Sequence, residues 1–432
     1  MTAHSTLGYP LVQRTLANGL RVIVSPDHAA PVVAVNLWYD VGSRDEASGA
    51  SGFAHLFEHL MFQGSESVGS GEHLNDMQAV GASVNATTSF DRTNYFEAVP
   101  TGALDLALWL EADRMATLPV ALTQSNLDNQ RDVVKEEKRQ RYDNVPYGDA
   151  LEHLLALTFP DGHPYAHSVI GSMADLDAAT TASAAAFFRR HYHPANCVLT
   201  LVGDLEPAEG FARAERYFGA VPAGPSQARP EATPLPPLVG VPRLTLTQPV
   251  PQDALYLTWR LPARGTRAFD ACDIALDVLG GSQTSRLYRA VVRDAALGSV
   301  TGASALGLIG GTSLGLAFGR ALEASAVAEV EDTMVAELLR FLEEGPTVDE
   351  LGRTRVQFER EWLSQLARVE SRADLFGAYA VLHGDPELVN TRVAAFCSVT
   401  AAEVRDAARV WLHPDHRAVL AYRRGPFGGV EA

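Results

Sequence analysis

Apolar residues along the chain fall into short runs typical of strands and longer stretches with helical spacing. The short runs predict strands at 20–24, 32–39, 197–202, 244–247, 254–261 and 418–422. Residues 85–90 and 95–99 flank a turn at Asp91-Arg92 and predict a hairpin, and the uncharged, glycine-rich stretch 300–319 predicts another. Strand runs and hairpins separated by helical blocks predict an α+β fold.

Prolines punctuate the chain near its middle. Seven of them lie between Pro222 and Pro242, interleaved with Gly, Ala and Ser. Proline at this density cannot continue a helix interior or a central strand, so residues 222–242 are predicted to form an extended linker. The linker divides the chain into a first lobe, residues 1–221, and a second lobe, residues 243–432.

The two lobes share a weak internal repeat. Shifted by 220 residues, the sequence matches itself at Thr180/Thr400, Arg189/Arg409, His193/His413 and Pro194/Pro414. The same offset also serves residues near the start of the repeat, which favours a duplication over a chance similarity of two Ala-rich segments. We therefore expect two similar lobes, each a largely antiparallel sheet with helices packed on it.

The charge balance narrows the range of partners. The 432 residues include 35 Lys+Arg and 52 Asp+Glu, a net charge of −17, whereas nucleic acids and anionic membranes attract basic proteins. We expect neither as a partner. The three cysteines form no CxxC pair, and the N-terminal residues lack the basic and apolar regions of a signal peptide. A cytoplasmic location is therefore expected.

One short segment carries candidate chemistry. Residues 55–59 read His-Leu-Phe-Glu-His, and a helix with Ser51 as N-cap and Gly64 as its C-terminal stop places them opposite an apolar stripe. Two imidazoles one helical turn apart are the arrangement that a single Zn²⁺ needs, so His55 and His59 are predicted metal ligands. The alternative is a solvated, His-rich helix face.

The same segment offers a general base. Glu58 lies beside the second imidazole, where a base must be to take a proton from zinc-bound water. A catalytic zinc also needs a third protein ligand. The charged helix predicted at 129–140 offers Glu136 and Glu137, and the residues alone do not decide between them. Such a run of charges is also typical of a solvated face.

The HLFEH motif and the later R-x-V-V-x-E-E segment together resemble the pitrilysin/insulinase family of zinc peptidases, whose inverted zinc motif is HxxEH. The segments LANGLRVIV, VGSRDE and SVNATTSFDRTNYFEAV are also similar to that family. The resemblance covers nearly the whole chain. It is closest to bacterial members that resemble the mitochondrial processing peptidase β subunit.

This resemblance implies roles for individual residues at the metal. It makes Glu137 the third ligand beside His55 and His59, with Glu58 as the base. Family members often carry a Glu where this chain has Gln130. An amide can orient a neighbouring ligand but raises its basicity less than a carboxylate does.

The resemblance also implies how substrate is held. In the family, the edge of the predicted hairpin pairs with the substrate backbone, and Asn85 and Ala86 lie at the cleft. Such pairing binds the main chain and tolerates varied side chains. The simpler alternative is that Asn85 only ends a strand.

The second lobe has lost the metal-binding groups. At the offset of 220, His55, Glu58, His59 and Glu137 correspond to Ala275, Val278, Leu279 and Gln357. The first lobe is therefore predicted to be the catalytic, zinc-binding one, and the second to be metal-free.

The second lobe also departs from self-sufficient family members, which supply an Arg and a Tyr seven residues apart to stabilise the tetrahedral intermediate. Here Arg293 matches the Arg, but Val300 lies seven residues on with Ser299 before it, and neither replaces a phenol. The chain in this respect resembles the zinc-bearing subunit of two-subunit members. We expect a heterodimer with a related chain that carries the Arg/Tyr pair, with a homodimer as the alternative.

The sequence thus predicts a zinc metalloendopeptidase with one Zn²⁺ per chain. Its substrates would be peptides or flexible segments bound as an extended strand between lobes. Two alternatives stay open at this point. One is a non-catalytic scaffold subunit, and the other is a maturation protease of narrow specificity that trims leader peptides.

Overall fold

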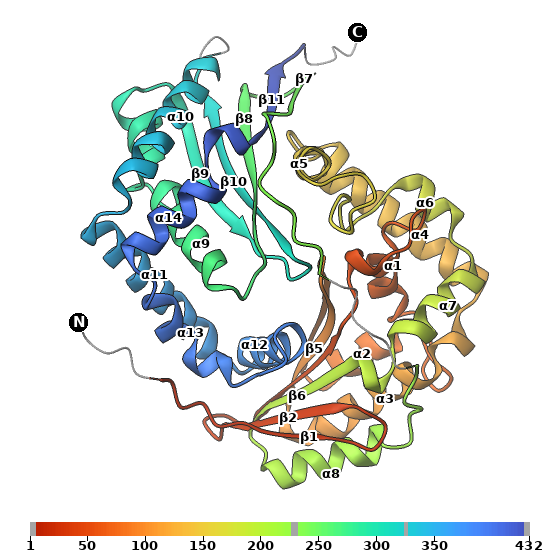
Figure 1. Ribbon diagram of the computed structural model, residues 1–432. Coiled ribbons are helices and arrows are strands. Elements are labelled where there is room, and N and C mark those ends of the chain that lie inside the picture. Colours follow the sequence, from red (N-terminus) through yellow and green to blue (C-terminus); the bar gives the residue numbers. More distant parts are fainter. Residues whose placement is uncertain (1–5, 226–231, 324–326, 427–432) are drawn as a thin grey trace. The chain divides into compact units, whose positions relative to one another are not determined.

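The computed structural model describes residues 6–225, 232–323 and 327–426. The chain forms two compact units, each built on one sheet (Figure 1). Unit 1 comprises Met1–Glu137, Ser168–Arg229 and Arg360–Ala394, and unit 2 comprises Lys138–His167, Pro230–Glu359 and Ala395–Ala432. The predicted linker therefore divides the sequence, whereas the compact units exchange one segment from each half.

The sheet of unit 1 has six strands in the order β1-β2-β6-β3-β5-β4. Strands β2 and β6 run parallel, and the other neighbours run antiparallel. The strands are β1 (Val12–Thr15), β2 (Arg21–Pro26), β3 (Val32–Tyr39), β4 (Ser83–Thr88), β5 (Thr93–Pro100) and β6 (Cys197–Gly203). The predicted first hairpin is the β4–β5 pair, and β4 forms one edge of the sheet.

The sheet of unit 2 repeats this arrangement. Its order is β7-β11-β8-β10-β9, and β7 and β11 form its parallel pair. The strands are β7 (Arg243–Gln248), β8 (Ala254–Pro262), β9 (Gly298–Leu306), β10 (Thr312–Ala321) and β11 (Ala418–Arg424). The order matches β2-β6-β3-β5-β4 strand for strand. The predicted duplication into two similar, largely antiparallel α+β halves is confirmed.

The two halves do not keep one offset throughout. Strand β6 pairs Leu201 with Val35, and β11 pairs Ala421 with Leu255, so the offset of 220 holds for these central strands. In the hairpins, however, Val35 pairs with Glu97 while Leu255 pairs with Gly319. Strands β5 and β10 therefore correspond at an offset two residues larger, whereas Val84 of β4 and Thr301 of β9, which pair with Glu97 and Gly319, correspond at an offset three residues smaller. The extra residues of the second half therefore lie in the turn of its hairpin.

Helices surround both sheets. Those with most of their residues in unit 1 are α1 (Phe53–Leu60), α2 (Glu72–Ala79), α3 (Leu104–Ala121), α4 (Gln124–Lys138), α6 (Met173–Ala178), α7 (Thr181–His191), α8 (Pro207–Phe218), α12 (Val369–Leu382) and α13 (Leu388–Cys397). The others are α5 (Ala150–Thr158), α9 (Arg267–Gly280), α10 (Val327–Glu344), α11 (Val348–Leu366) and α14 (Ala401–Trp411). A π-helical turn, Arg139–Asp143, follows α4.

Each sheet is covered on one face by a helix from the other half of the sequence (Figure 1). Helix α12 packs on β3 and β6 of unit 1, where Gly377 lies against the Trp38 ring; a Cβ at this glycine would be 2.7 Å from Trp38 Cδ1. Helix α5 packs on β8 and β11 of unit 2. The opposite face of the unit 2 sheet carries α9, α10 and α14 around one apolar core.

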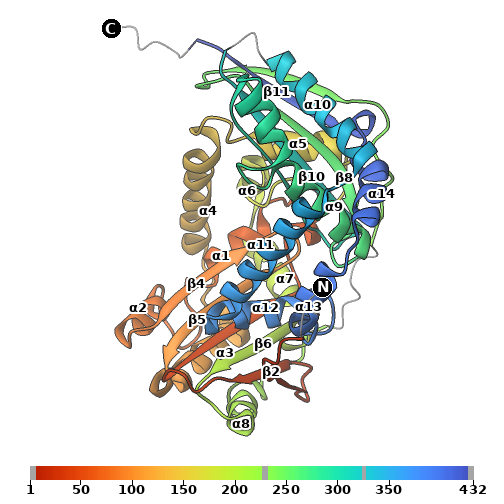
Figure 2. The ribbon, with the colours of Figure 1, turned by 90° about the vertical axis from the view of Figure 1, so that its left-hand side faces the viewer.

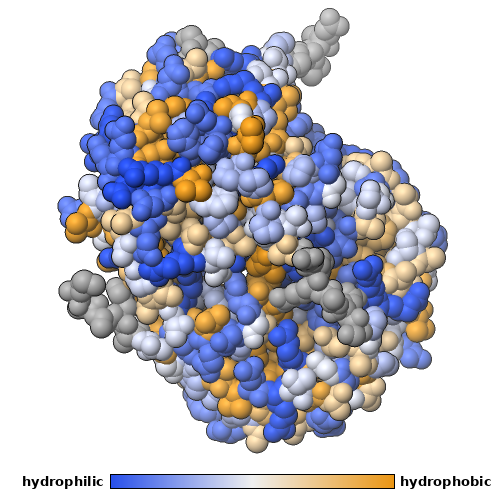
Figure 3. Space-filling model, viewed as in Figure 1, coloured by the Kyte–Doolittle hydropathy of each residue, from blue (hydrophilic) through white to orange (hydrophobic). Residues whose placement is uncertain are grey.

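The predicted linker lies partly outside the described residues. Its described parts, 222–225 and 232–242, contain no helix or strand, as proline density predicts. None of the helices in the described ranges combines the length and apolarity needed to cross a bilayer. On the face shown in Figure 3, hydrophilic residues are interspersed with smaller groups of apolar ones.

Candidate metal centre

Helix α1 begins at Phe53, two residues before the first predicted ligand. The residue that precedes it, Gly52, has a φ of 90°, and a Cβ there would lie 2.7 Å from a neighbouring backbone oxygen, so only glycine fits. The prediction of Ser51 as the N-cap is wrong. Its hydroxyl instead donates to Asp175 Oδ2 at 2.6 Å, which fixes the turn from outside the helix.

A carboxylate from an upstream loop caps this helix. Glu46 accepts hydrogen bonds from Gly52 N at 2.9 Å and from Ala54 N at 2.7 Å. Burial raises the pKa of Glu46 well above its usual range, although these two N–H groups oppose the shift. The sequence reasoning missed this residue. The available signal was an acid shortly before a helix, in the segment VGSRDE.

The apolar stripe of α1 is buried as predicted. Phe57 stacks on Phe187 and Tyr192 with ring centroids 5.1 and 5.4 Å apart, and Leu60 is 1% exposed. The helix ends at Leu60, so the predicted stop at Gly64 is several residues late. This packing turns the other side of the helix, with its two imidazoles and one carboxylate, away from the core.

Three of the predicted site residues meet beside this helix. Glu137 Oε2 lies 3.4 Å from His59 Nε2 and 3.6 Å from His55 Nε2. Glu137 comes from α4, which runs beside α1 (Figure 2). Its neighbour Glu136 is exposed. Of the two glutamates that the residues alone leave open, Glu137 is the one that lies near both imidazoles.

The spacing of these atoms fits a zinc ion. Zinc in a tetrahedral site with bonds of 2.0–2.2 Å separates its ligand atoms by about 3.4 Å. The two distances from Glu137 match this value. Two imidazole nitrogens and one carboxylate oxygen form a donor set typical of catalytic zinc, with a fourth position left for water or substrate.

Gln130 lies on the same face of α4 as Glu137. It is seven residues, or two helical turns, nearer the N-terminus and is 8% exposed. It therefore sits on the buried side of α4, where a residue that orients the third ligand is expected.

Glu58 is half-buried next to the second imidazole. Thr88 Oγ1 donates a hydrogen bond to Glu58 Oε2 at 2.6 Å. Burial raises the pKa of Glu58 above its usual value, and the Thr88 hydrogen bond and the charges of His59 and Arg92 oppose this shift. A carboxylate held in this way is suited to take up and release a proton.

Asn85 and Ala86 lie in β4, at the sheet edge (Figure 2). Within the described sheet β4 has one neighbour, β5. Asn85 is exposed, and its Oδ1 accepts from Ala86 N at 2.9 Å, whereas Ala86 is 7% exposed. The backbone edge here is the surface that a peptide strand would need for main-chain pairing.

The corresponding helix of unit 2 contains none of these polar groups. Ala275, Val278 and Leu279 of α9 are buried and belong to the apolar core shared with α10 and α14. Gln357 and Val278 line a small pocket of about 50 Å³. At the positions that correspond to His55, Glu58 and His59, unit 2 thus has buried aliphatic side chains.

The segment predicted to lack a phenol does lack one. Arg293 is exposed on a π-helical turn, Tyr288–Asp294. Ser299 Oγ donates to Gln252 Oε1 at 2.9 Å, and Val300 pairs with Arg320 inside the sheet. Neither side chain can take over the hydrogen bond that a tyrosine hydroxyl would donate.

A second group of His and Glu side chains lies in the core of unit 1. His73 Nε2 is 2.7 Å from Glu97 Oε1 and 3.9 Å from Glu111 Oε1, and the Arg114 guanidinium binds the Glu111 carboxylate through Nε at 2.9 Å. Burial raises the pKa of each Glu to about 7 and lowers that of His73 to about 3. Because Arg114 already supplies the positive charge, we interpret this group as a structural network.

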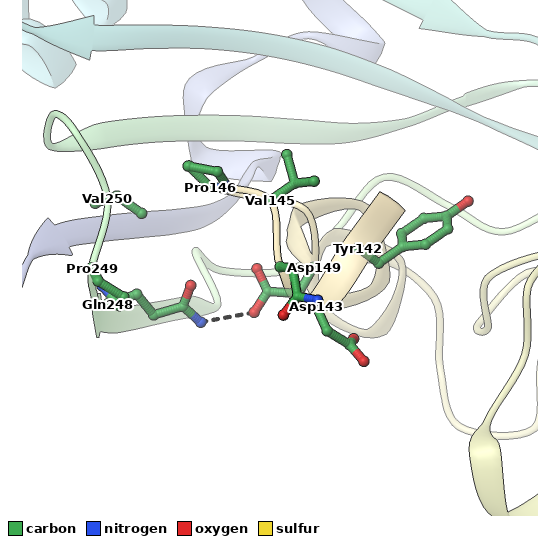
Figure 4. Close-up of a pocket in the computed structure, with 9 residues that line it drawn as sticks. Tyr142, Asp143, Val145, Pro146, Asp149, Gln248, Pro249 and Val250 are labelled. Carbon is green, nitrogen blue, oxygen red and sulfur yellow. Dashed lines mark hydrogen bonds between the residues drawn. The ribbon is translucent and has the colours of Figure 1, made fainter. Parts of the chain in front are cut away.

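A larger pocket, of about 650 Å³, lies in unit 2 beside the π-helical turn after α4 (Figure 4). Val145, Pro146 and Pro249 line it together with Asp149, whose Oδ2 accepts from Gln248 Nε2 at 2.8 Å. None of its lining residues is one of the predicted site residues.

The comparisons with known proteins agree with this fold. A family model described as insulinase (peptidase family M16) matches residues 21–172, and one described as the peptidase M16 inactive domain matches residues 178–358. The zinc protease PqqE of Helicobacter pylori is 30% identical over 376 residues, which covers 85% of this chain and 82% of that protein. The chain therefore belongs to the M16, or insulinase, family of peptidases.

Two further relatives show the breadth of this family. The crystal structure of a protease from Helicobacter pylori aligns with a TM-score of 0.89 and 26% identity, covering 96% of this chain and 99% of that one. Subunit 1 of the mitochondrial cytochrome b-c1 complex of Bos taurus is 28% identical over 206 residues, 48% of this chain and 42% of that protein. The family thus includes both named proteases and a respiratory-complex subunit.

Proposed function

We propose that this chain is a zinc metalloendopeptidase in which His55, His59 and Glu137 bind one Zn²⁺ and Glu58 is the general base. The observation that carries the proposal is the position of Glu137 Oε2, 3.4 and 3.6 Å from the two imidazole nitrogens. Helices far apart in the sequence bring these groups together at the spacing of zinc ligands. The similarity to a named zinc protease supports the same reading.

The residues of the chain divide the chemistry between them. Zinc, when bound, polarises the scissile carbonyl and acidifies a water. Thr88 holds Glu58 Oε2, which leaves Oε1 to take a proton from the attacking water and pass it to the leaving amine. Peptides or flexible segments bind as an extended strand along β4, near Asn85 and Ala86, through main-chain hydrogen bonds.

A second, related subunit completes the enzyme in this proposal. The support is the segment at Arg293 to Val300, which carries an exposed guanidinium but no phenol. A partner chain with an Arg/Tyr pair and no HxxEH motif would supply the missing electrostatic stabilisation. A homodimer is the alternative. Size-exclusion chromatography with light scattering, on the chain alone and mixed with a candidate partner, separates the two.

The test of the proposed function is cleavage of an unstructured fluorogenic peptide by the zinc-loaded chain, alone and with the candidate partner. We expect one zinc per chain and activity that Glu58→Gln lowers by about 10³-fold, because general acid–base catalysis contributes on that scale. The Glu58→Gln variant should keep its zinc. Activity that survives this change, or a chain that binds no zinc, contradicts the proposal.

The competing function is that of a non-catalytic scaffold subunit. The similarity to a subunit of the cytochrome b-c1 complex favours it. A scaffold needs neither the His55, His59 and Glu137 geometry nor a carboxylate beside it, so the intact centre favours catalysis. A cytoplasmic location is proposed as well, supported by three buried cysteines that form no disulfide, and cell fractionation tests it.

A further inference from the structure

Strand β4 ends in two threonines that point to opposite faces of the sheet, as successive residues of a strand do. Thr87 Oγ1 donates to Asn94 Oδ1 at 2.6 Å, on the cross-strand partner. Thr88 Oγ1 donates to Glu58 Oε2 at 2.6 Å, on helix α1. The end of the edge strand is thus bonded on both sides.

The Thr87 side is anchored to a helix from the second half of the sequence. Asn94 Nδ2 and Trp38 Nε1 both donate to Asp374 Oδ1 at 2.9 Å, and Asp374 lies on α12. Arg92 Nη1 donates to Thr87 O at 2.7 Å and to Asn94 Oδ1 at 3.0 Å. The backbone that carries Thr88 therefore has a rigid support.

The side chain of Glu58 is less restrained than the helix that carries it, so it depends more on such a support. Helix α1 is fixed by its Glu46 cap and its aromatic packing, but a glutamate side chain keeps three rotatable bonds beyond the backbone. A hydroxyl 2.6 Å from one carboxylate oxygen restricts these rotations. Small losses of orientation at a reacting group cost large factors in rate.

We propose that Thr88 is a positioning residue for the base: its hydroxyl holds Glu58 Oε2 so that Oε1 faces the water to be activated. The inference rests on the proposed function, because it assigns Glu58 that task. It adds a second role to the end of β4, whose backbone edge was assigned to substrate.

The test compares Thr88→Val, which is nearly isosteric but cannot donate, with Thr88→Ser, which keeps the hydroxyl. We expect Thr88→Val to lower kcat about tenfold with KM and zinc affinity unchanged, as for loss of one hydrogen bond to a charged group. Thr88→Ser should restore most of kcat. A crystal structure of metal-free Thr88→Val should show the Glu58 carboxylate displaced.

Two controls separate positioning from other roles. Thr87→Val makes the same change one residue away on the opposite face, and an equal loss of kcat there would mean that the strand is merely loosened. In a Glu58→Gln background, Thr88→Val should leave the affinity for a fluorescent peptide unchanged. A weaker affinity would assign Thr88 to substrate binding and overturn the inference.

The failures are distinguishable. If the parent chain shows no Glu58-dependent cleavage with or without partner, the proposed function fails. If it cleaves, and Thr88→Val retains full kcat or an undisplaced Glu58 carboxylate, the function stands and the positioning role is rejected.

Discussion

Helices α1 and α9 occupy the same place in two sheets of the same strand order, yet they are built differently. Helix α1 has eight residues, begins after a left-handed Gly52 and is capped by a distant carboxylate, Glu46. Helix α9 has 14 residues and is capped by its own Thr266, whose Oγ1 accepts from Phe269 N at 3.1 Å. The longer, self-capped helix is the one without the metal-binding groups.

Corresponding residues of the two helices also differ in polarity. Where α1 has Glu58 and His59, α9 has Val278 and Leu279, which are 5% and 2% exposed. The fold therefore forms without the metal-binding groups, and the centre is a local addition to one copy.

A second contrast lies deeper in the two units. Glu97 of β5 takes part in the buried network of unit 1, and the strand register places Gly319 of β10 at the corresponding position. A Cβ on Gly319 would meet Val330 and Met334 at 2.9 and 3.3 Å. At this position unit 1 has buried ionisable groups, whereas unit 2 has a close apolar contact.

The strongest test of the difference between α1 and α9 is to exchange one residue between them. His59→Leu should abolish zinc binding at micromolar metal and lower peptidase activity by at least about 10³-fold, because a catalytic zinc with two protein ligands is not retained. Its thermal stability in the metal-free state should not fall, since a partly exposed imidazole is removed. Zinc analysis, calorimetry and peptide cleavage check all three.

The reciprocal change should act on stability instead. Leu279→His buries an imidazole without a partner in the apolar core of unit 2, which costs about 2–4 kcal/mol in the free energy of unfolding. Urea unfolding measures the loss. If Leu279→His were harmless, or if His59→Leu unfolded the protein, the two helices would not differ in the way described.

A smaller expected effect is that stability depends on pH through the buried groups of unit 1. Glu97 has its pKa raised from 4.5 to about 7, so the folded state holds its proton more tightly than the unfolded state. Its contribution to stability is therefore complete below pH 4.5 and declines as pH rises towards 7. Glu97→Gln removes this titration, so the variant should gain on the parent by on the order of 2 kcal/mol between pH 5 and 8.

Chemical unfolding at several pH values checks this expectation. Gln keeps the size of Glu97 and one acceptor for His73, so a constant offset between the two proteins reports lost packing alone. A difference that grows with pH supports the buried, protonated carboxyl. A difference that shrinks would mean that Arg114 keeps Glu97 ionised in the folded protein.

The smallest expected effect concerns the caps. Glu46→Ala and Thr266→Ala should each lower the free energy of unfolding by about 1–2 kcal/mol, since each removes acceptors for helix N–H groups. Only Glu46→Ala should also weaken zinc binding, by several-fold, because α1 starts two residues before His55. Equal zinc affinities in the two variants would show that the cap does not support the metal centre.

Much of this fold was predictable because its signals are local. Alternation and apolar runs predicted the strands, the glycine pair predicted the turn at 310–311, and helical phase predicted the face that carries His55 and His59. The choice of Glu137 came from resemblance, and the geometry agrees with it. Each of these inferences uses residues within one element or one recognisable motif.

The features that escaped prediction depend mainly on contacts between elements. The Thr88 hydrogen bond joins a strand to a helix, and nothing in its sequence neighbourhood marks it, whereas the Glu46 cap had only the weak signal of an acid shortly before a helix. The offset between β5 and β10, which is two residues larger than that between the central strands, is visible only in the strand register. The sequence contained no signal for which helices would pack on the sheet of the other half.

The exchange of helices between the two halves has a consequence for a chain that contains a single repeat. In a single copy of the repeat, one face of the sheet would be exposed. The helix that covers this face, α12 in unit 1 and α5 in unit 2, comes from the other half of the sequence. A chain with one repeat would therefore need a second copy to cover that face, as in a domain-swapped dimer. Joining two repeats in one chain makes this exchange intramolecular, which raises the effective concentration of each helix for its sheet. The second repeat can then lack the metal ligands, as it does at Ala275, Val278 and Leu279, while the first repeat keeps them.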